Sequence, residues 1–183
     1  NKLGNLLGTR TFQWMLVANG IIGPLLLGGA VATFFNGSNF IVDKGNLTSL
    51  QPVISHWANA SYGLDALLDP WNLLFGMSVF FLARMLGTLY IINNVDDENI
   101  RCRASVRLLG CTIAFLLLFL PFLIRTLLKD GFAIDKTTGM IVMESEKYLN
   151  NLVTMWPLLV MFAIGVALLL YGTVRTTMSN TYI

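Results

Sequence analysis

One arginine lies inside a long apolar stretch, where a positive charge is costly. Arg84 is the only Asp, Glu, Lys or Arg between residues 70 and 95. It follows Trp71 by thirteen residues and precedes Asn93 by nine, so a helix with a rise of about 1.5 Å per residue places it near mid-membrane. A charge at that depth costs about 2.5–3.5 kcal/mol on insertion scales and usually faces the protein interior. We therefore expect Arg84 to make a buried polar contact, an ion pair or a ligand contact; the alternative is a side chain that snorkels or draws in water.

The chain offers few donors for metal or redox chemistry. Its single histidine is His56, and its two cysteines are Cys102 and Cys111. His56 has no His or Cys at metal-ligand spacing, so a solvated or interfacial imidazole is a plainer interpretation than a ligand given to another chain. Both cysteines are expected to be reduced thiols. We predict no catalytic, cofactor-binding or metal-binding residue in this chain, and no haem bound by it alone.

Three further arginines, Arg101, Arg103 and Arg107, follow the acidic run of residues 96–98. On a short connection between spans, such a mixed run favours a solvated turn whose arginines set the membrane orientation. An interface with a partner subunit is the alternative.

The elements that must position these residues are apolar helices. Hydrophobic residues make up 55% of the chain and charged residues 12%, against about 25% charged in an average soluble domain. The sequence therefore predicts an all-α integral membrane protein with four transmembrane helices, at about 12–35, 71–93, 107–124 and 149–174. The net charge of +2 excludes a strongly basic nucleic-acid-binding protein.

The connections predict the topology. An even number of spans puts both ends and the 94–106 connection on one side, and the basic residues closest to the spans lie there, so this side is expected to be cytoplasmic. The long external loop at 36–70 becomes amphipathic in its second half, which favours a segment lying at the membrane surface. Residues 132–143 predict a small external β-hairpin around a glycine-containing turn.

The order of several motifs resembles a known family. Residues 67–76, Leu-Leu-Asp-Pro-Trp-Asn-Leu-Leu-Phe-Gly, resemble the Leu-Leu-Asn-Pro-Phe-x-Leu-Leu-x-Gly start of a central helix in subunit II of the bacterial cytochrome bd quinol oxidases. Gly87 and Tyr90 match the Gly and Tyr near the end of that helix, and residues 101–104 match the Arg-x-Arg-Ala that closes the next loop. Asp69 stands where the family usually has Asn. The resemblance covers essentially the whole chain.

The resemblance implies a two-subunit oxidase of the bacterial inner membrane. Such an enzyme oxidises quinol, reduces oxygen to water and contributes to the proton gradient. Haems b and d are held mainly by subunit I, so this chain is expected to be a non-haem-ligating membrane subunit whose partners are subunit I, quinol and the lipid bilayer. It is also expected to be a segment of a longer subunit, spanning the junction between two four-helix bundles.

Two other classes of function stay open from the residues alone. A fragment of a multi-span membrane transporter would also have Gly- and Pro-interrupted helices and an intramembrane charge. A four-span scaffold without chemistry of its own is the other.

Overall fold

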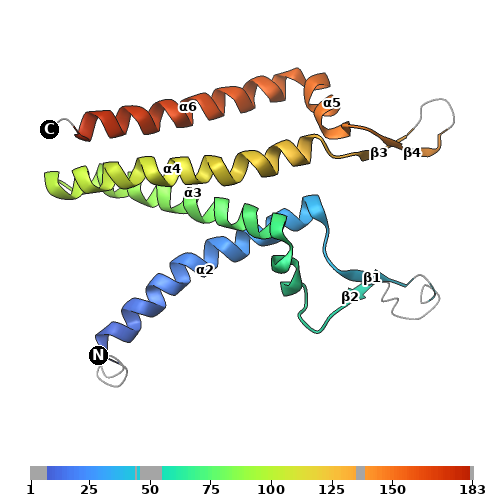
Figure 1. Ribbon diagram of the computed structural model, residues 1–183, viewed down its shortest axis with the longest axis horizontal. Helices are drawn as coiled ribbons and strands as arrows, with labels where there is room; N and C mark the ends of the chain where they lie inside the picture. Colours follow the sequence, from blue (N-terminus) through green and yellow to red (C-terminus); the bar gives the residue numbers. More distant parts are fainter. Residues whose placement is uncertain (1–7, 44, 46–54, 135–138, 182–183) are drawn as a thin grey trace. The chain divides into compact units, whose positions relative to one another are not determined.

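The computed structural model describes residues 8–43, 45, 55–134 and 139–181. Within these residues, four helices are long and apolar enough to cross a membrane: α2 (Thr9–Asn36), α3 (Pro70–Asn94), α4 (Glu98–Leu127) and α6 (Trp156–Thr181) (Figure 1). The predicted all-α membrane fold with four spans is therefore confirmed. The chain divides within α3 into two compact units, Asn1–Phe80 and Phe81–Ile183, which are described in turn.

The first unit holds α2, the start of α3 and the segment between them. That segment forms a two-stranded antiparallel sheet, β1 (Phe40–Val42) with β2 (Ser55–Trp57), and a short 3₁₀ helix, η2 (Leu64–Leu68). The sequence did not predict this sheet, because three-residue strands leave too short a pattern to detect. The end of α2 and the start of α3 lie so close that a Cβ on Gly28 would come within 2.8 Å of the Gly76 Cα. Small residues thus allow a close helix contact.

The motif at residues 67–76 marks the point where α3 begins. Pro70 is the first helical residue, a position where its missing N–H costs nothing. The carboxylate Oδ1 of Asp69 accepts hydrogen bonds from the backbone N–H groups of Trp71, at 2.8 Å, and Asn72, at 3.3 Å. Asp69 therefore caps the helix, a role that Asn performs equally well.

The second unit holds the rest of α3, α4, α6 and the elements between α4 and α6. Helices α4 and α6 lie side by side (Figure 1). Its buried core joins α3 to α4 through Met85, Ile92, Ala104, Leu108 and Cys111, with Leu169 of α6 packed against it. Among the described residues, no buried side-chain nitrogen or oxygen lacks a hydrogen-bond partner, as an apolar environment requires.

Helix α4 begins earlier than the sequence predicts. The expected cytoplasmic connection at 94–106 is largely helical, because α4 starts at Glu98 rather than near Arg107. The Oδ1 of Asp97 accepts a hydrogen bond from the Ile100 N–H at 3.0 Å, and Glu98 lies in the positive first turn. Apolarity marks the membrane-embedded part of a helix, whereas the cap marks where the helix starts, so the charged first turns were missed.

The fourth predicted span is two helices. The structure has α5 (Lys147–Thr154), a turn at Met155 and then α6, where the sequence predicts one span over 149–174. Pro157 lies at the start of α6, and proline cannot donate a backbone hydrogen bond to the preceding turn. Because residues 148–174 include no charged residue, the charge pattern did not indicate this break.

The predicted hairpin is confirmed, and its external position stays a prediction. Strands β3 (Gly131–Ile134) and β4 (Ile141–Glu144) pair antiparallel, with Phe132 opposite Met143. The tip of the predicted turn, residues 135–138, lies outside the described residues.

Candidate functional site

One hollow in the second unit is lined by three of the four arginines that the sequence analysis identified. Arg84 on α3 and Arg103 and Arg107 on α4 border a space of about 430 Å³, here called the α3–α4 hollow. Its other lining residues are Gly87, Thr88, Ile91, Ile100 and Ala104. The charge within a span and the charges on the connection, which were interpreted separately, therefore belong to one surface.

Helical periodicity explains why these residues share a surface. On α3 the lining residues are 84, 87, 88 and 91, and on α4 they are 100, 103, 104 and 107. Both sets follow the spacing i, i+3, i+4, i+7, which is one face of an α-helix. The antiparallel hairpin of α3 and α4 brings these two faces next to each other.

Arg84 is not enclosed by the described helices of the second unit. Its side chain is exposed on the surface of the second unit, as are Ala83 and Gly87 beside it. A buried contact for Arg84 within an assembled complex therefore stays a prediction.

Arg101 lies on another surface of α4 and contacts the connection between the helices. Its Nε donates to the Val95 carbonyl oxygen at 2.8 Å, and its Nη2 lies 2.9 Å from Asp96 Oδ1. The ion pair is solvent-exposed and contributes at most about 1 kcal/mol. Both contacts join Arg101 to the turn between α3 and α4. The acidic run at 96–98 thus supplies a helix cap and a partner for this arginine.

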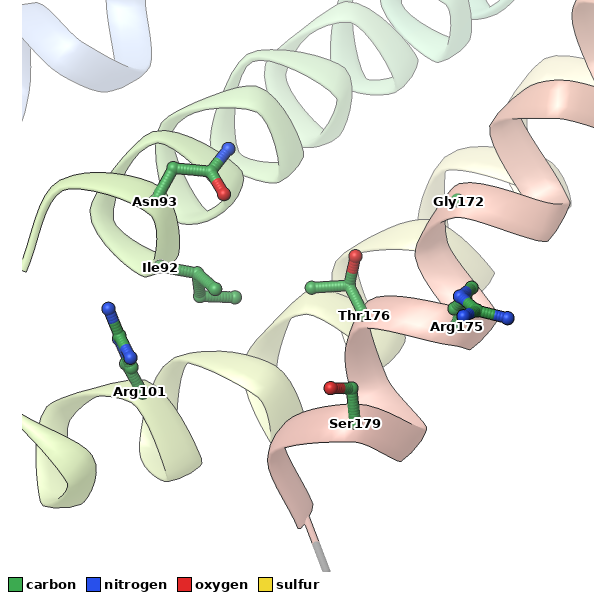
Figure 2. A pocket seen from close by; sticks show the side chains of 7 residues that line it. All are labelled: Ile92, Asn93, Arg101, Gly172, Arg175, Thr176 and Ser179. Carbon is green, nitrogen blue, oxygen red and sulfur yellow. The ribbon is translucent and has the colours of Figure 1, made fainter. Parts of the chain in front are cut away.

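A second basic hollow lies between the ends of α3, α4 and α6 (Figure 2). Arg101 and Arg175 border a space of about 450 Å³, together with Ile92, Asn93, Gly172, Thr176 and Ser179. Arg175 Nη1 donates to the Tyr171 hydroxyl oxygen at 3.3 Å. This hollow therefore presents guanidinium groups from two helices, α4 and α6.

Guanidinium groups bind anions and do not exchange protons near neutral pH. Within the described part of the chain, no group of three or more His, Cys, Asp and Glu side chains could hold a metal ion. His56 lies on β2 opposite Ile41 and is exposed. Cys111 is buried in the core of the second unit, and Cys102 is exposed. The arrangement is suited to binding an anion rather than to acid–base or nucleophilic chemistry.

The sequence analysis missed a polar cluster in the first unit, centred on Asp65. Its Oδ2 accepts hydrogen bonds from Asn39 Nδ2 at 2.7 Å and Asn59 Nδ2 at 2.9 Å, and its Oδ1 accepts from the Ser61 hydroxyl at 2.9 Å. These bonds, that of Asn39 first, lower the pKa of Asp65 below its usual value. The available signal was the concentration of Asn and Ser around a single carboxylate in an otherwise weakly charged loop.

Because its pKa is lowered on folding, Asp65 stabilises the loop above its usual pKa and loses this effect as the pH falls through the lowered value. We expect Asp65→Ala to raise the rate of proteolytic cleavage within residues 36–69 severalfold at neutral pH, whereas the wild-type loop should open only in strong acid. Asp43→Ala is the matched control, since Asp43 Oδ1 accepts a local hydrogen bond from the Gly45 N–H at 2.8 Å. Equal cleavage of Asp65→Ala and wild type at neutral pH would show that Asp65 does not hold the loop.

Much of the apolar surface of the four long helices is exposed on this chain. On α6 the exposed side chains include Trp156, Met161, Leu168 and Tyr171. Exposed apolar surface on this scale indicates contact with lipid tails or with other membrane helices.

Comparison with known families gives one match that covers nearly the whole chain. The family model described as cytochrome bd terminal oxidase subunit II matches residues 2–182. Comparisons with curated proteins and with solved structures find no match.

Proposed function

The chain belongs to the family of cytochrome bd terminal oxidase subunit II, and from this premise we propose that it is a non-haem-ligating membrane subunit of a bacterial oxidase that oxidises quinol and reduces oxygen to water. The observation that carries the proposal is the match over residues 2–182. The four apolar helices agree with a multi-pass membrane subunit of a respiratory oxidase complex. The oxidation of two quinols to quinones releases the four electrons that reduce one oxygen molecule to two waters.

Family membership favours this function over the alternatives left open by the residues. A transporter fragment was proposed from the interrupted helices and from Arg84. In the structure, α2 continues as a helix through Pro24, and Arg84 lies on a surface with two other arginines. Neither feature supplies the unwound intramembrane segment that marks a transporter site.

The single histidine of this chain does not fit an axial haem site. The single imidazole lies on a three-residue strand whose side chains are all exposed, whereas an axial ligand is normally enclosed with its macrocycle. We therefore assign the haems b and d of the complex, and the ligands that hold them, mainly to subunit I, and we propose that subunit I and quinol are the partners of the complex in the bacterial inner membrane.

The division of the chain within α3 supports a further part of the proposal. Each compact unit contains only part of a helical bundle, and each leaves long apolar helix surfaces exposed. This is the arrangement expected for a segment that contributes to two neighbouring four-helix bundles of a longer subunit.

Purification through a tag on this chain tests the function. We expect a complex with quinol-dependent oxygen uptake and haem absorption bands, and neither property in the chain expressed without its partner subunit. His56→Ala should leave the haem spectrum unchanged. A purified complex without haem or quinol-dependent oxygen uptake would overturn the assignment.

We also propose that both ends of the chain and the α3–α4 connection are cytoplasmic. Arg101, Arg103, Arg107 and Arg175 all lie at that end of the second unit, and the positive-inside rule counts basic residues close to span ends. The two small sheets would then be external.

Cysteine labelling checks this topology. In a background without Cys102 and Cys111, a membrane-impermeant maleimide should label cysteines at Ala60 and Ser145 in intact spheroplasts. Cysteines at Glu98 and Ser179 should react only after permeabilisation. Labelling at position 98 in intact spheroplasts would invert the model of the topology.

A further inference from the structure

The α3–α4 hollow combines a concentrated positive charge with an apolar wall. Three guanidinium groups, those of Arg84, Arg103 and Arg107, line it, and among the eight described residues that border it none is acidic. Arg103 and Arg107 are four residues apart on α4, a spacing at which like charges repel. An anion in the hollow would relieve this repulsion. Arg101 does not border this hollow, and its guanidinium pairs with Asp96 at 2.9 Å.

Arg84 and Arg107 lie at similar depths in the helix hairpin, and Arg103 lies one helical turn closer to the connection. Arg84 is ten residues from the end of α3 at Asn94, and Arg107 is nine residues from the start of α4 at Glu98. At a rise of about 1.5 Å per residue, both are roughly 14–15 Å from the connection. Arg107 also directly precedes the uncharged stretch at 108–124, so the hollow lies where the hydrocarbon region of the membrane begins. Arg84 is then closer to the headgroups than its position in α3 alone suggests.

The other lining residues suit a ligand that is partly apolar. Ile91, Ile100 and Ala104 provide aliphatic surface, and Gly87 has open space beside its Cα. A phospholipid suits both parts of the lining. Its phosphate would accept hydrogen bonds from the guanidinium groups, and its glycerol and acyl chains would lie along the aliphatic residues.

We propose that the α3–α4 hollow is a binding site for the headgroup phosphate of an anionic phospholipid. An anionic lipid is preferred to a zwitterionic one, because three positive charges attract its net negative charge and repel a choline or ethanolamine ammonium group. The position at the edge of the apolar stretch and the aliphatic wall favour a lipid over free phosphate or an acidic side chain of a partner subunit. The proposal needs only that the chain is membrane-embedded, so it stands apart from the quinol oxidase reaction.

The test uses the purified complex and spin-labelled lipids. We expect phosphatidylglycerol to bind more tightly than phosphatidylcholine to the wild-type complex. Arg84→Gln, Arg103→Gln and Arg107→Gln should each weaken phosphatidylglycerol binding about fivefold, the factor for about 1 kcal/mol per basic residue at a membrane surface. Arg103→Lys should retain most of the affinity, since it keeps the charge.

Arg175→Gln is the matched control. Arg175 is a basic residue at the same end of the second unit but lines the other hollow, so its loss should leave phosphatidylglycerol binding unchanged. Haem absorption and quinol-dependent oxygen uptake report whether each variant complex is assembled, independently of lipid binding.

Two added measurements separate other occupants of the hollow. Inorganic phosphate at millimolar concentration should fail to displace the labelled phosphatidylglycerol; full displacement would identify a free-anion site and overturn the lipid proposal. Loss of the partner subunit from the Gln variants would identify an acidic protein partner and would also overturn it. Equal binding of both lipids, unaffected by the three substitutions, would show that the hollow has no lipid preference.

Discussion

Gly28→Ala should destabilise the protein by about 1–3 kcal/mol, the usual cost of forcing extra atoms into a tight contact. A Cβ at this position would lie 2.8 Å from the Gly76 Cα and 2.9 Å from the Val79 Cβ. The first of these atoms belongs to the backbone of α3, which cannot move aside as the end of a flexible side chain can. The helices must therefore separate, and they lose packing along their contact.

Gly20→Ala is the control for this prediction. Gly20 lies on the same helix, α2, and a Cβ there would meet no atom within 4 Å in the described chain. Thermal unfolding of the purified complex, followed by tryptophan fluorescence, should show a lower midpoint for Gly28→Ala and little change for Gly20→Ala. Equal midpoints for Gly28→Ala and wild type would show that α2 and α3 do not approach this closely.

Asn72→Leu should also destabilise the protein by about 1–3 kcal/mol, because it leaves polar groups near the start of α3 without partners. Asn72 is 2% exposed. Its Nδ2 donates to the Ala66 carbonyl oxygen at 2.9 Å, and its Oδ1 accepts from Asn36 Nδ2 at 2.7 Å. Asn72 thus joins the end of α2, η2 and the start of α3, so its loss should loosen all three.

The control for Asn72 lies at the other end of the same helix. Asn94 is exposed, and its Nδ2 donates only locally, to the Tyr90 carbonyl oxygen at 2.8 Å. Asn94→Leu should leave the unfolding midpoint nearly unchanged. If both variants unfold at the same temperature as wild type, the buried amide does not hold the elements of the first unit together.

Several local features could be predicted from the residues because their causes are local. The hairpin at β3 and β4 follows from two short apolar runs around a turn, and the N-terminal end of α3 follows from Asp69 and Pro70. The start of α4 at Glu98 and the break at Met155 were not predicted. The capping carboxylate of Asp97 determines the start of α4, and Pro157 marks the break before α6. Composition indicated only where the chain is apolar.

The sequence by itself determined the membrane character of this protein, its four spans and its family, because the length of an apolar stretch and the order of short motifs are properties of the chain alone. Only the tertiary structure decided which residues meet. The close contact of Gly28 with Gly76, the burial of Asn72 and the shared surface of Arg84, Arg103 and Arg107 each depend on which faces of two helices pack together. Helices that are apolar on every side carry no polar stripe to show which face turns inward, so side-chain packing selects the contact. For α3 and α4, packing through Met85, Ile92 and Leu108 places the arginines together.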